Sequence, residues 1–453
     1  MRLKASPSKV LMLTGGTLIA VTGIAAQLRF PDAWEGYVAT LRIFVPLAIL
    51  SGILYLASVA TILRVELPKR ALWGILLVAG LMRLIVLPMT PMLSTDVYRY
   101  VWDGRVQAAG INPYRYIPQA PELTFLRDET IYPNINRAYY ARTIYPPVAE
   151  ALYFLVARAS PTVFAMKAAM VAFEILVIIA VFRLLDDAGL PRMRVLIYAW
   201  NPLAVWEFAG NGHVDSAAIG FIALALLARS RRRMVWTGAA LGAATLVKFL
   251  PLVLFPALWR RWDLRMPAAF AFVVLVSYLC FVGAGRHILG FLPGYVSEEG
   301  LQSGSGIYYL FLLGQIAKAP PAWVYMAAVA FLLVGLGYRM AFLRPLSGAP
   351  ESETLDVAKY ALLLATALMV AITPHYPWYF AWLALPACLV PSYSVLYLTV
   401  AGFLLYFDPR HVFVLWRGVV YLGFPLLALA ELWWRRRQEP AGPANPYARR
   451  ISQ

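Results

Sequence analysis

The chain has 453 residues, of which 61% are hydrophobic and only 14% are charged, with a mean hydropathy of +0.67. Soluble proteins usually carry about 25% charged residues, so this composition excludes an ordinary soluble protein. The formal charge of +17 could indicate nucleic-acid binding, but the basic residues form short clusters between apolar runs, which is typical of cytoplasmic loops near anionic lipids. The clusters are Arg2/Lys4/Lys9, Lys69/Arg70, Arg229/Arg231/Arg232/Arg233, Arg260/Arg261/Arg265 and Arg435/Arg436/Arg437.

Long apolar runs recur along the whole chain, and a membrane helix needs roughly 20 such residues. The expected spans are 10–28, 40–63, 71–88, 162–183, 195–208, 214–228, 234–258, 267–284, 322–343, 357–373, 378–391, 393–407 and 412–434, with half-length apolar pieces at 147–157 and 307–317. Several are short enough to be tilted, re-entrant or broken. The sequence therefore predicts an all-α polytopic membrane protein with about 11 to 13 membrane helices.

The expected organisation is one membrane domain over residues 1–437, followed by a disordered cytoplasmic tail at 438–453, whose composition is poor in apolar residues. The first apolar run lacks a convincing small-residue cleavage site, so it is expected to be a retained span. Cys280 and Cys388 both lie in apolar segments, which gives no pattern for a disulfide framework or a metal site.

Orientation follows from the basic clusters. If they are cytoplasmic, the polar segments 89–145, 211–215, 285–306 and 374–377 fall on the external face. The loop at 89–146 is long for a connection, yet it has signals of order. Asp96, Arg99, Tyr100, Asp103 and Gln107 share one face of a predicted surface helix. Gly110 is a plausible C-terminal cap of that helix, with Pro113 beyond it.

Asp96 is the sharpest candidate for chemistry. "STD" is a good helix start, so this carboxylate can be a cap. It can also be a partly desolvated base at the membrane boundary that accepts a proton from a substrate hydroxyl. Asp103 is expected to pair with Arg99 or Arg105. A function of Asp96 as a helix cap is compatible with a function as a base.

Further polar islands interrupt the apolar runs. In "TIYPPVAEAL", Pro146 and Pro147 indicate a helix start, and Glu150 is an unusual acid in an apolar segment. In "NPLAVWEFAGNGHVD" the polar residues are not spaced for a convincing metal site, and hydrogen bonding to a sugar or its phosphate is expected instead. Those residues are Glu207, Asn211, His213 and Asp215.

Two cationic candidates lie near the membrane. Lys248 in "LVKFLP" sits in an otherwise apolar run, where it either snorkels to the interface or binds a lipid-linked phosphate. His375 lies beside the aromatic belt of "TPHYPWYFAWLALP" and can simply be an interfacial histidine. Arg286, in the loop after the 267–284 span, is a weaker candidate.

These islands, in this order, resemble the GT-C superfamily of integral-membrane glycosyltransferases, and most closely its bacterial mannosyltransferase-like members that use polyprenyl-phosphate sugars. The likeness is carried by "STDVYRYVWDGRVQAAGINPY", "IYPPVAEALYFL", "NPLAVWEFAGNGHVDS", "GAALGAATLVKFLPLVLFP" and "PHYPWYFAWLALP". The resemblance differs in two places. The large loop follows the third expected span rather than the first, and His375 is separated from Pro-Trp by a tyrosine.

The resemblance implies that Asp96 is the catalytic base and makes Lys248 and His375 candidates for the donor phosphate. It implies a polyprenyl-phosphate sugar donor, a glycolipid or glycan acceptor, no cofactor or metal, and activity on the external side of a bacterial plasma membrane. The other candidates for donor binding are His213, Asn211 and Arg99, and the supporting residues are Asp103, Tyr145, Glu150, Glu207, Asp215 and Arg286.

The expected reaction is direct, inverting displacement. A polyprenyl-phosphate leaving group is a stable anion, so it needs cations more than an acid, whereas the acceptor hydroxyl needs a base. Mannose is the family-level expectation, with glucose, arabinose or another pentose as alternatives. A transporter or flippase of lipid-linked sugars also contains embedded charges and broken helices, although the sequence shows no internal repeat. A non-catalytic assembly subunit is the third alternative.

Overall fold

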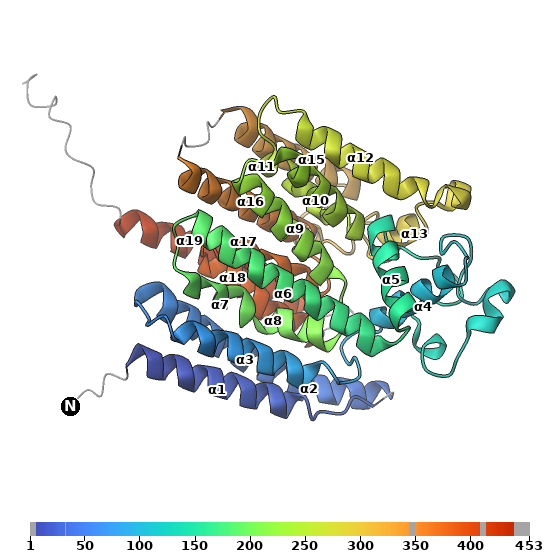
Figure 1. Ribbon diagram of the computed structural model, residues 1–453, viewed down its shortest axis with the longest axis horizontal. Helices are drawn as coiled ribbons and strands as arrows, with labels where there is room; N and C mark the ends of the chain where they lie inside the picture. The colour runs from blue at the N-terminus through green and yellow to red at the C-terminus, as the bar shows by residue number, and fades with distance from the viewer. Residues whose placement is uncertain (1–5, 32, 344–348, 408–413, 439–453) are drawn as a thin grey trace, which may run out of the picture.

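The structure is a computed structural model that describes residues 6–31, 33–343, 349–407 and 414–438. Within these ranges the chain forms helices and no β-strand, which confirms the all-α class. The helices form a bundle with their axes running between two ends, and one end carries a layer of shorter helices and loops (Figure 1). Of the expected tail, only Gln438 is described, and 439–453 lie outside the described residues.

Among the described residues, six helices are long and apolar enough to cross a membrane. They are α1 (Pro7–Ala25), α2 (Trp34–Arg64), α6 (Val163–Asp187), α15 (Ala322–Tyr338, with a π-helical extension Arg339–Leu343), α16 (Pro350–Ile372) and α19 (Val414–Gln438). Two bent pairs raise the number to as many as eight. They are α8 (Pro202–Ala204) and η4 (Val205–Gly210) with α9 (Asp215–Ser230), and α12 (Arg265–Leu279) with η6 (Val282–His287) and α13 (Leu292–Glu298).

The remaining helices are shorter. Three are apolar pieces: α3 (Ala71–Val86), α10 (Met234–Val247), and α18 (Tyr393–Ala401) continuing into η9 (Gly402–Phe407). The others are α4 (Asp96–Ala108), α5 (Pro147–Ala159), α7 (Leu196–Ala199), α11 (Phe255–Leu258), α14 (Tyr308–Ile316), α17 (Ala384–Ala387), η1 (Pro121–Leu126), η2 (Tyr132–Asn134), η3 (Arg192–Val195), η5 (Leu250–Leu254) and η8 (Pro377–Leu383).

The sequence predicted about 11 to 13 membrane helices, with several apolar runs tilted, re-entrant or broken, whereas six to eight of the described helices pass by length and composition. The 234–258 run breaks after Val247, because Lys248 adopts an extended backbone and Pro251 follows it. The 378–391 run forms short helices whose residues are nearly all buried inside the protein. An apolar run can therefore mark the core of a membrane protein as well as a lipid-facing span.

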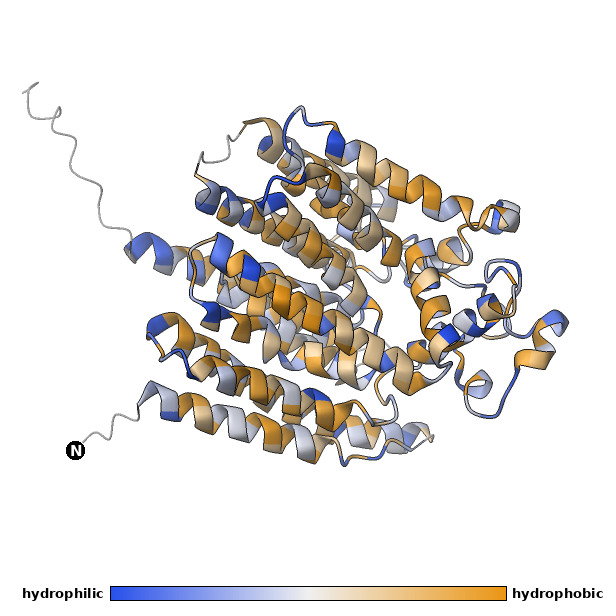
Figure 2. Ribbon diagram, in the orientation of Figure 1, coloured by the Kyte–Doolittle hydropathy of each residue, from blue (hydrophilic) through white to orange (hydrophobic). Residues whose placement is uncertain are grey.

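Apolar residues line the helices of the bundle, while hydrophilic residues gather at the ends and in the end layer (Figure 2). Two buried ion pairs hold the interior together. Arg83 of α3 contacts Glu174 of α6 at 2.5 Å, and Arg229 of α9 contacts Glu353 of α16 at 2.7 Å. A charge in an apolar interior is tolerated when it is paired in this way.

The end layer is built on α4 and α5. The predicted surface helix is confirmed, because α4 begins at Asp96 and ends at Ala108, with Gly110 at φ +78° just beyond it. Pro147 opens α5, with Pro146 as its N-cap, as the sequence indicated. The two helices pack so closely that a methyl group on Gly104 would overlap the Tyr153 carbonyl oxygen. Glycine is therefore required there, and the contact sets the position of α4.

The Arg229–Arg233 cluster lies at the end of the bundle away from this layer. α9 begins at Asp215 and runs to the Arg229–Arg233 cluster, and α10 returns from that cluster to Lys248. Because Lys248 bonds to Asp215, both helices start or finish at the same end, and the arginines lie at the other. The N-terminal and C-terminal ends of the described chain are also at the arginine end (Figure 1).

Candidate functional site

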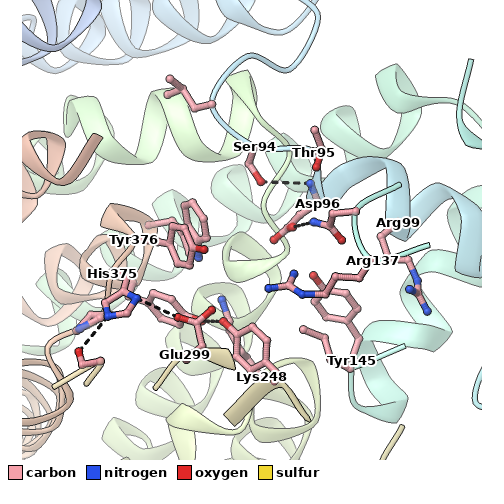
Figure 3. Close-up of a pocket in the computed structure, with 18 of the residues that line it drawn as sticks. Ser94, Thr95, Asp96, Arg99, Arg137, Tyr145, Lys248, Glu299, His375 and Tyr376 are labelled. Atoms are coloured by element: carbon pink, nitrogen blue, oxygen red, sulfur yellow. Dashed lines mark hydrogen bonds and ion pairs between the residues drawn. The ribbon is translucent and has the colours of Figure 1, made fainter. Parts of the chain in front are cut away.

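A cavity of about 600 Å³ opens where the end layer meets the bundle. Its lining comes from segments far apart in the sequence, namely the start of α2, the segment entering α4, the loop before α5, the end of α10, α13 and the chain after α16. Asp96, Arg137, Lys248, Glu299 and His375 all lie around this space (Figure 3). One part of the lining is polar and charged, and another is apolar, including Trp34, Leu292, Val296, Leu301, Ile372 and Leu405.

Asp96 stands in the first turn of α4 and retains 24% of its side-chain exposure. It does not cap the helix, because Thr95 occupies the N-cap position. Asn136 Nδ2 donates a hydrogen bond of 2.7 Å to Asp96 Oδ1, and no Lys or Arg of the described residues forms an ion pair with this carboxylate. Burial raises the pKa of Asp96, although the Asn136 hydrogen bond and the Lys248 and Arg137 charges oppose the shift.

Lys248 lies at the C-terminal end of α10, with its side chain 21% exposed. It lines the cavity rather than snorkelling along a continuous helix. Its ammonium group donates to both carboxylate oxygens of Asp215 at 2.8 Å and lies 4.1 Å from the centre of the Tyr379 ring. The ion pair with Asp215 offsets part of the free-energy cost of placing the Lys248 charge in apolar surroundings.

His375 also lines the cavity, despite the extra tyrosine in its motif. Its Nε2 lies 3.0 Å from the Gly306 carbonyl oxygen, and its Nδ1 lies 3.5 Å from Glu299 Oε2. Glu299 therefore belongs to the site. The neighbouring rings of Tyr376 and Trp378 are stacked, with centroids 4.4 Å apart, and form an aromatic part of the cavity lining.

Arg99 and Tyr145 line the same cavity. Arg99 Nε donates to both oxygens of Asp103, at 2.8 and 2.9 Å, which confirms the predicted pairing of Asp103 with Arg99. Arg99 also donates to the Ala141 carbonyl oxygen and so ties α4 to the loop that carries Asn136. The Tyr145 ring packs edge-on against Tyr100, 5.0 Å away.

Seven of the expected residues do not line the cavity, namely Asn211, His213, Glu207, Asp103, Glu150, Asp215 and Arg286. Glu150 is fully buried and accepts hydrogen bonds from Thr143 and Gln107, which joins α5 to α4. Asp215 also stands outside the lining and reaches the cavity only through Lys248. Arg286 is exposed in η6 and does not line the cavity either.

Asn211 supports the segment that leads to Asp96. Its Oδ1 accepts hydrogen bonds of 3.0 Å from the backbone N–H groups of Met92 and Leu93, and its Nδ2 donates to the Trp206 carbonyl oxygen. This buried amide thus provides an acceptor for two backbone N–H groups that would otherwise lack a hydrogen-bond partner. The geometry favours a structural function for Asn211 over direct contact with a ligand.

Four charged or amide residues of the site were missed by sequence reasoning: Asn136, Arg137, Arg142 and Glu299. All line the cavity. Arg137 forms an ion pair of 2.6 Å with Glu298, and its backbone is left-handed at φ +57°, which is uncommon for a non-glycine residue and concentrates at functional sites. Asn136, Arg137 and Arg142 lie in a loop whose residues follow no helical or strand pattern. The sequence therefore gave no signal for them beyond their polar character in an external loop.

Among the described residues, no group of three or more His, Cys, Asp or Glu side chains is arranged to hold a metal ion. The lining combines charged side chains, among them Asp96, Lys248 and Arg137, with apolar ones. Fold and site together define a polytopic membrane protein with a cavity of mixed charged and apolar lining.

Residues 8–263 match the family described as alpha-(1->6)-mannopyranosyltransferase, N-terminal domain. The match covers more than half of the chain, and the chain belongs to this family, which is a mannosyltransferase family of the GT-C type. The resemblance stated from the motifs is confirmed. The matched region contains Asp96, His213 and Lys248, whereas His375 lies beyond it. No curated protein and no solved structure shows significant similarity to the chain.

We predict that Asn211→Ala lowers the free energy of unfolding by about 2 kcal/mol, because the backbone N–H groups of Met92 and Leu93 lose their acceptor. Thermal unfolding in detergent measures this effect. Asn134→Ala is the matched control, since Asn134 is exposed and bonds only locally to Thr130. Equal stability of the two variants would contradict the structural function of Asn211.

Proposed function

We propose that this membrane mannosyltransferase takes mannose from a polyprenyl-phosphate donor and transfers it to a hydroxyl group of a glycan or glycolipid acceptor. The observation that carries the proposal is the position of Asp96, a carboxylate without a Lys or Arg ion-pair partner among the described residues, in a cavity that also presents Lys248 and Arg137. The family supports mannose as the sugar and transfer as the reaction.

Asp96 acts as the general base in this proposal. The acceptor hydroxyl gives its proton to the carboxylate while its oxygen attacks the anomeric carbon. The bond to the phosphate oxygen breaks at the same time, and its electron pair leaves with the phosphate. Because one carboxylate takes the proton and no covalent sugar intermediate is needed, the anomeric configuration inverts. An α-linked product then requires a β-linked donor.

The leaving phosphate is stabilised by cations rather than by an acid. The cations that line the cavity are Lys248, Arg137 and Arg142. His375 lines it too, next to the aromatic residues Tyr376 and Trp378. Lys248 already neutralises Asp215, so its attraction for phosphate is shared with that carboxylate. The apolar part of the cavity suits the start of a polyprenyl chain, and no cofactor or metal is required by this mechanism.

The external face is the proposed location of the reaction. The cavity lies at the end of the bundle opposite the Arg229–Arg233 cluster, and basic clusters favour the cytoplasmic side. The proposed membrane is the bacterial plasma membrane, because polyprenyl-phosphate sugars are donors of the bacterial members that the chain resembles.

We predict that Asp96→Asn lowers kcat by at least about 100-fold while donor affinity stays within twofold, because the amide keeps the shape but cannot take the proton. Purified protein, a polyprenyl-phosphate mannose donor and membrane glycolipids provide the assay, with products identified by mass spectrometry. Asp128→Asn is the control, since Asp128 pairs with Arg105 away from the cavity. Full turnover by Asp96→Asn would overturn the assignment of the base.

We predict that the rate falls on the acidic side at a pH above the ordinary pKa of an aspartate. Burial raises the pKa of Asp96, and only its ionised form accepts a proton. Asn136→Leu removes a hydrogen bond that favours the ionised form, so the pKa rises further and the acidic fall in rate moves to higher pH. Asn134→Leu should leave that pH unchanged. A shift toward lower pH in Asn136→Leu would refute this account of the base.

We predict that Lys248→Met combined with Asp215→Asn raises the donor KM about tenfold, which is the effect of losing one charge-assisted contact to phosphate. The double variant avoids leaving Asp215 as an unpaired buried charge. Asp215→Asn alone retains the ammonium group and removes its competitor, so its donor KM should not rise. A double variant with the donor KM of the wild type would show that Lys248 only supports the fold.

A further inference from the structure

A group of buried polar side chains lies behind Asp96, outside the cavity lining. His213 has 1% side-chain exposure and Glu207 has none. His213 Nδ1 lies 4.0 Å from Asp96 Oδ2, and His213 Nε2 lies 3.4 Å from Glu207 Oε2. The imidazole therefore stands between the catalytic carboxylate and a second carboxylate, without access to the donor.

The position of His213 is held without the use of its ring nitrogens. Its ring is stacked on Trp378, with centroids 4.1 Å apart, and its backbone N–H donates to the Glu207 carbonyl oxygen at 2.9 Å. Gly212, at φ +76°, makes the tight turn before it, and a methyl group there would meet Val97 at 2.9 Å. Packing and backbone thus aim the two nitrogens at the two carboxylates.

Neither nitrogen of His213, nor Glu207 Oε2, has a hydrogen-bond partner among the described residues. The other oxygen, Glu207 Oε1, accepts a bond of 2.6 Å from the Tyr406 hydroxyl. Buried polar groups are rarely left unpaired, and here three such atoms stand next to one another and next to the base. Catalytic hydrogen bonds are often long in the absence of substrate and tighten in the reactive complex.

We propose that the His213–Glu207 pair is a proton relay that takes the substrate proton from Asp96. This inference rests on the proposed function of Asp96 as the base. With Nε2–H directed at Glu207 Oε2, the lone pair of Nδ1 faces Asp96. After sugar transfer the proton on Asp96 Oδ2 moves to Nδ1. Asp96 is again a carboxylate, and Glu207 Oε2, 3.4 Å from Nε2, accepts from the imidazolium.

The relay disfavours the reverse reaction. A proton held on Asp96 can return to the product oxygen, whereas a proton held on His213 is separated from the product by the carboxylate itself. Once the product has left and water enters the cavity, the proton returns through Asp96 to solvent. His213 and Glu207 act through Asp96 and do not touch the reacting atoms, so they are positioning residues.

Several elements contribute charged and polar groups around this relay. Glu207 stands beside Nε2 of His213, and the Lys248 charge opposes an imidazolium. Arg137 and Asn136 act on Asp96 from the loop side, and the Tyr406 hydroxyl donates to one oxygen of Glu207. Burial, together with the Lys248 charge, keeps the imidazole neutral between turnovers, so that Nδ1 can accept a proton.

The test is chemical rescue of His213→Ala. This variant should lower kcat by about 100-fold, with donor KM within twofold and Asp96 still in place. Added imidazole should restore activity, and the restored rate should follow the concentration of neutral imidazole as pH changes. Pyrazole fills the same space but is a far weaker base, so it should not restore the rate. A structural loss would respond to the two compounds alike.

Two further variants complete the experiment. Glu207→Gln retains an acceptor for Tyr406 but cannot stabilise an imidazolium, and it should lower kcat about tenfold and change the solvent deuterium isotope effect. His287→Gln is the control, because His287 lies in η6 outside the cavity lining and should retain wild-type kinetics. Folding of each variant is checked by its thermal midpoint and donor affinity.

The relay and the base assignment fail in different ways. An inactive Asp96→Asn together with a fully active His213→Gln, with its pH profile and isotope effect unchanged, would overturn the relay alone. An active Asp96→Asn would overturn the base, and the relay with it. Rescue of His213→Ala by pyrazole as well as imidazole would show that the ring only fills space.

Discussion

The cost of placing charge inside an apolar helix bundle governs this structure. Most of its buried residues are hydrophobic, and an unpaired ion among them would cost several kcal/mol or more. The chain meets this constraint by pairing: Arg83 with Glu174, Arg229 with Glu353, Arg99 with Asp103, and Lys248 with Asp215. Each pair also joins two segments or stiffens one, so the charged groups contribute to the architecture as well as to the site.

Against this background the environment of Asp96 is distinctive. It is partly desolvated, yet its described partners are an amide and a distant imidazole rather than a cation within ion-pair distance. A carboxylate in that setting keeps its affinity for a proton, which a tight Arg or Lys pair would suppress. The surrounding structure maintains this state. Asn211 holds the segment before it, and the close contact of Gly104 with α5 sets the angle at which α4 presents it.

Local features were predictable from sequence because they depend on neighbouring residues. The spacing of apolar and polar residues after Asp96, with Gly110 beyond, predicted α4, and the Pro146–Pro147 pair predicted the start of α5. The Arg99–Asp103 pair follows from a spacing of four residues on one helix. The number of spans was less predictable. Hydropathy measures removal from water and does not distinguish lipid from protein interior, so the buried run after Pro377 looked like a crossing.

The sequence by itself determined the class of the protein, its helical surface loop, the acid at the start of that loop and the family motifs that contain it. Only the tertiary structure decided which polar residues share the cavity. It brought in Asn136, Arg137 and Glu299, and it placed Asn211, His213 and Glu207 behind Asp96 rather than in the cavity lining. The reason is physical: contacts between segments a hundred or more residues apart depend on how helices pack and where they break. No local pattern records that geometry.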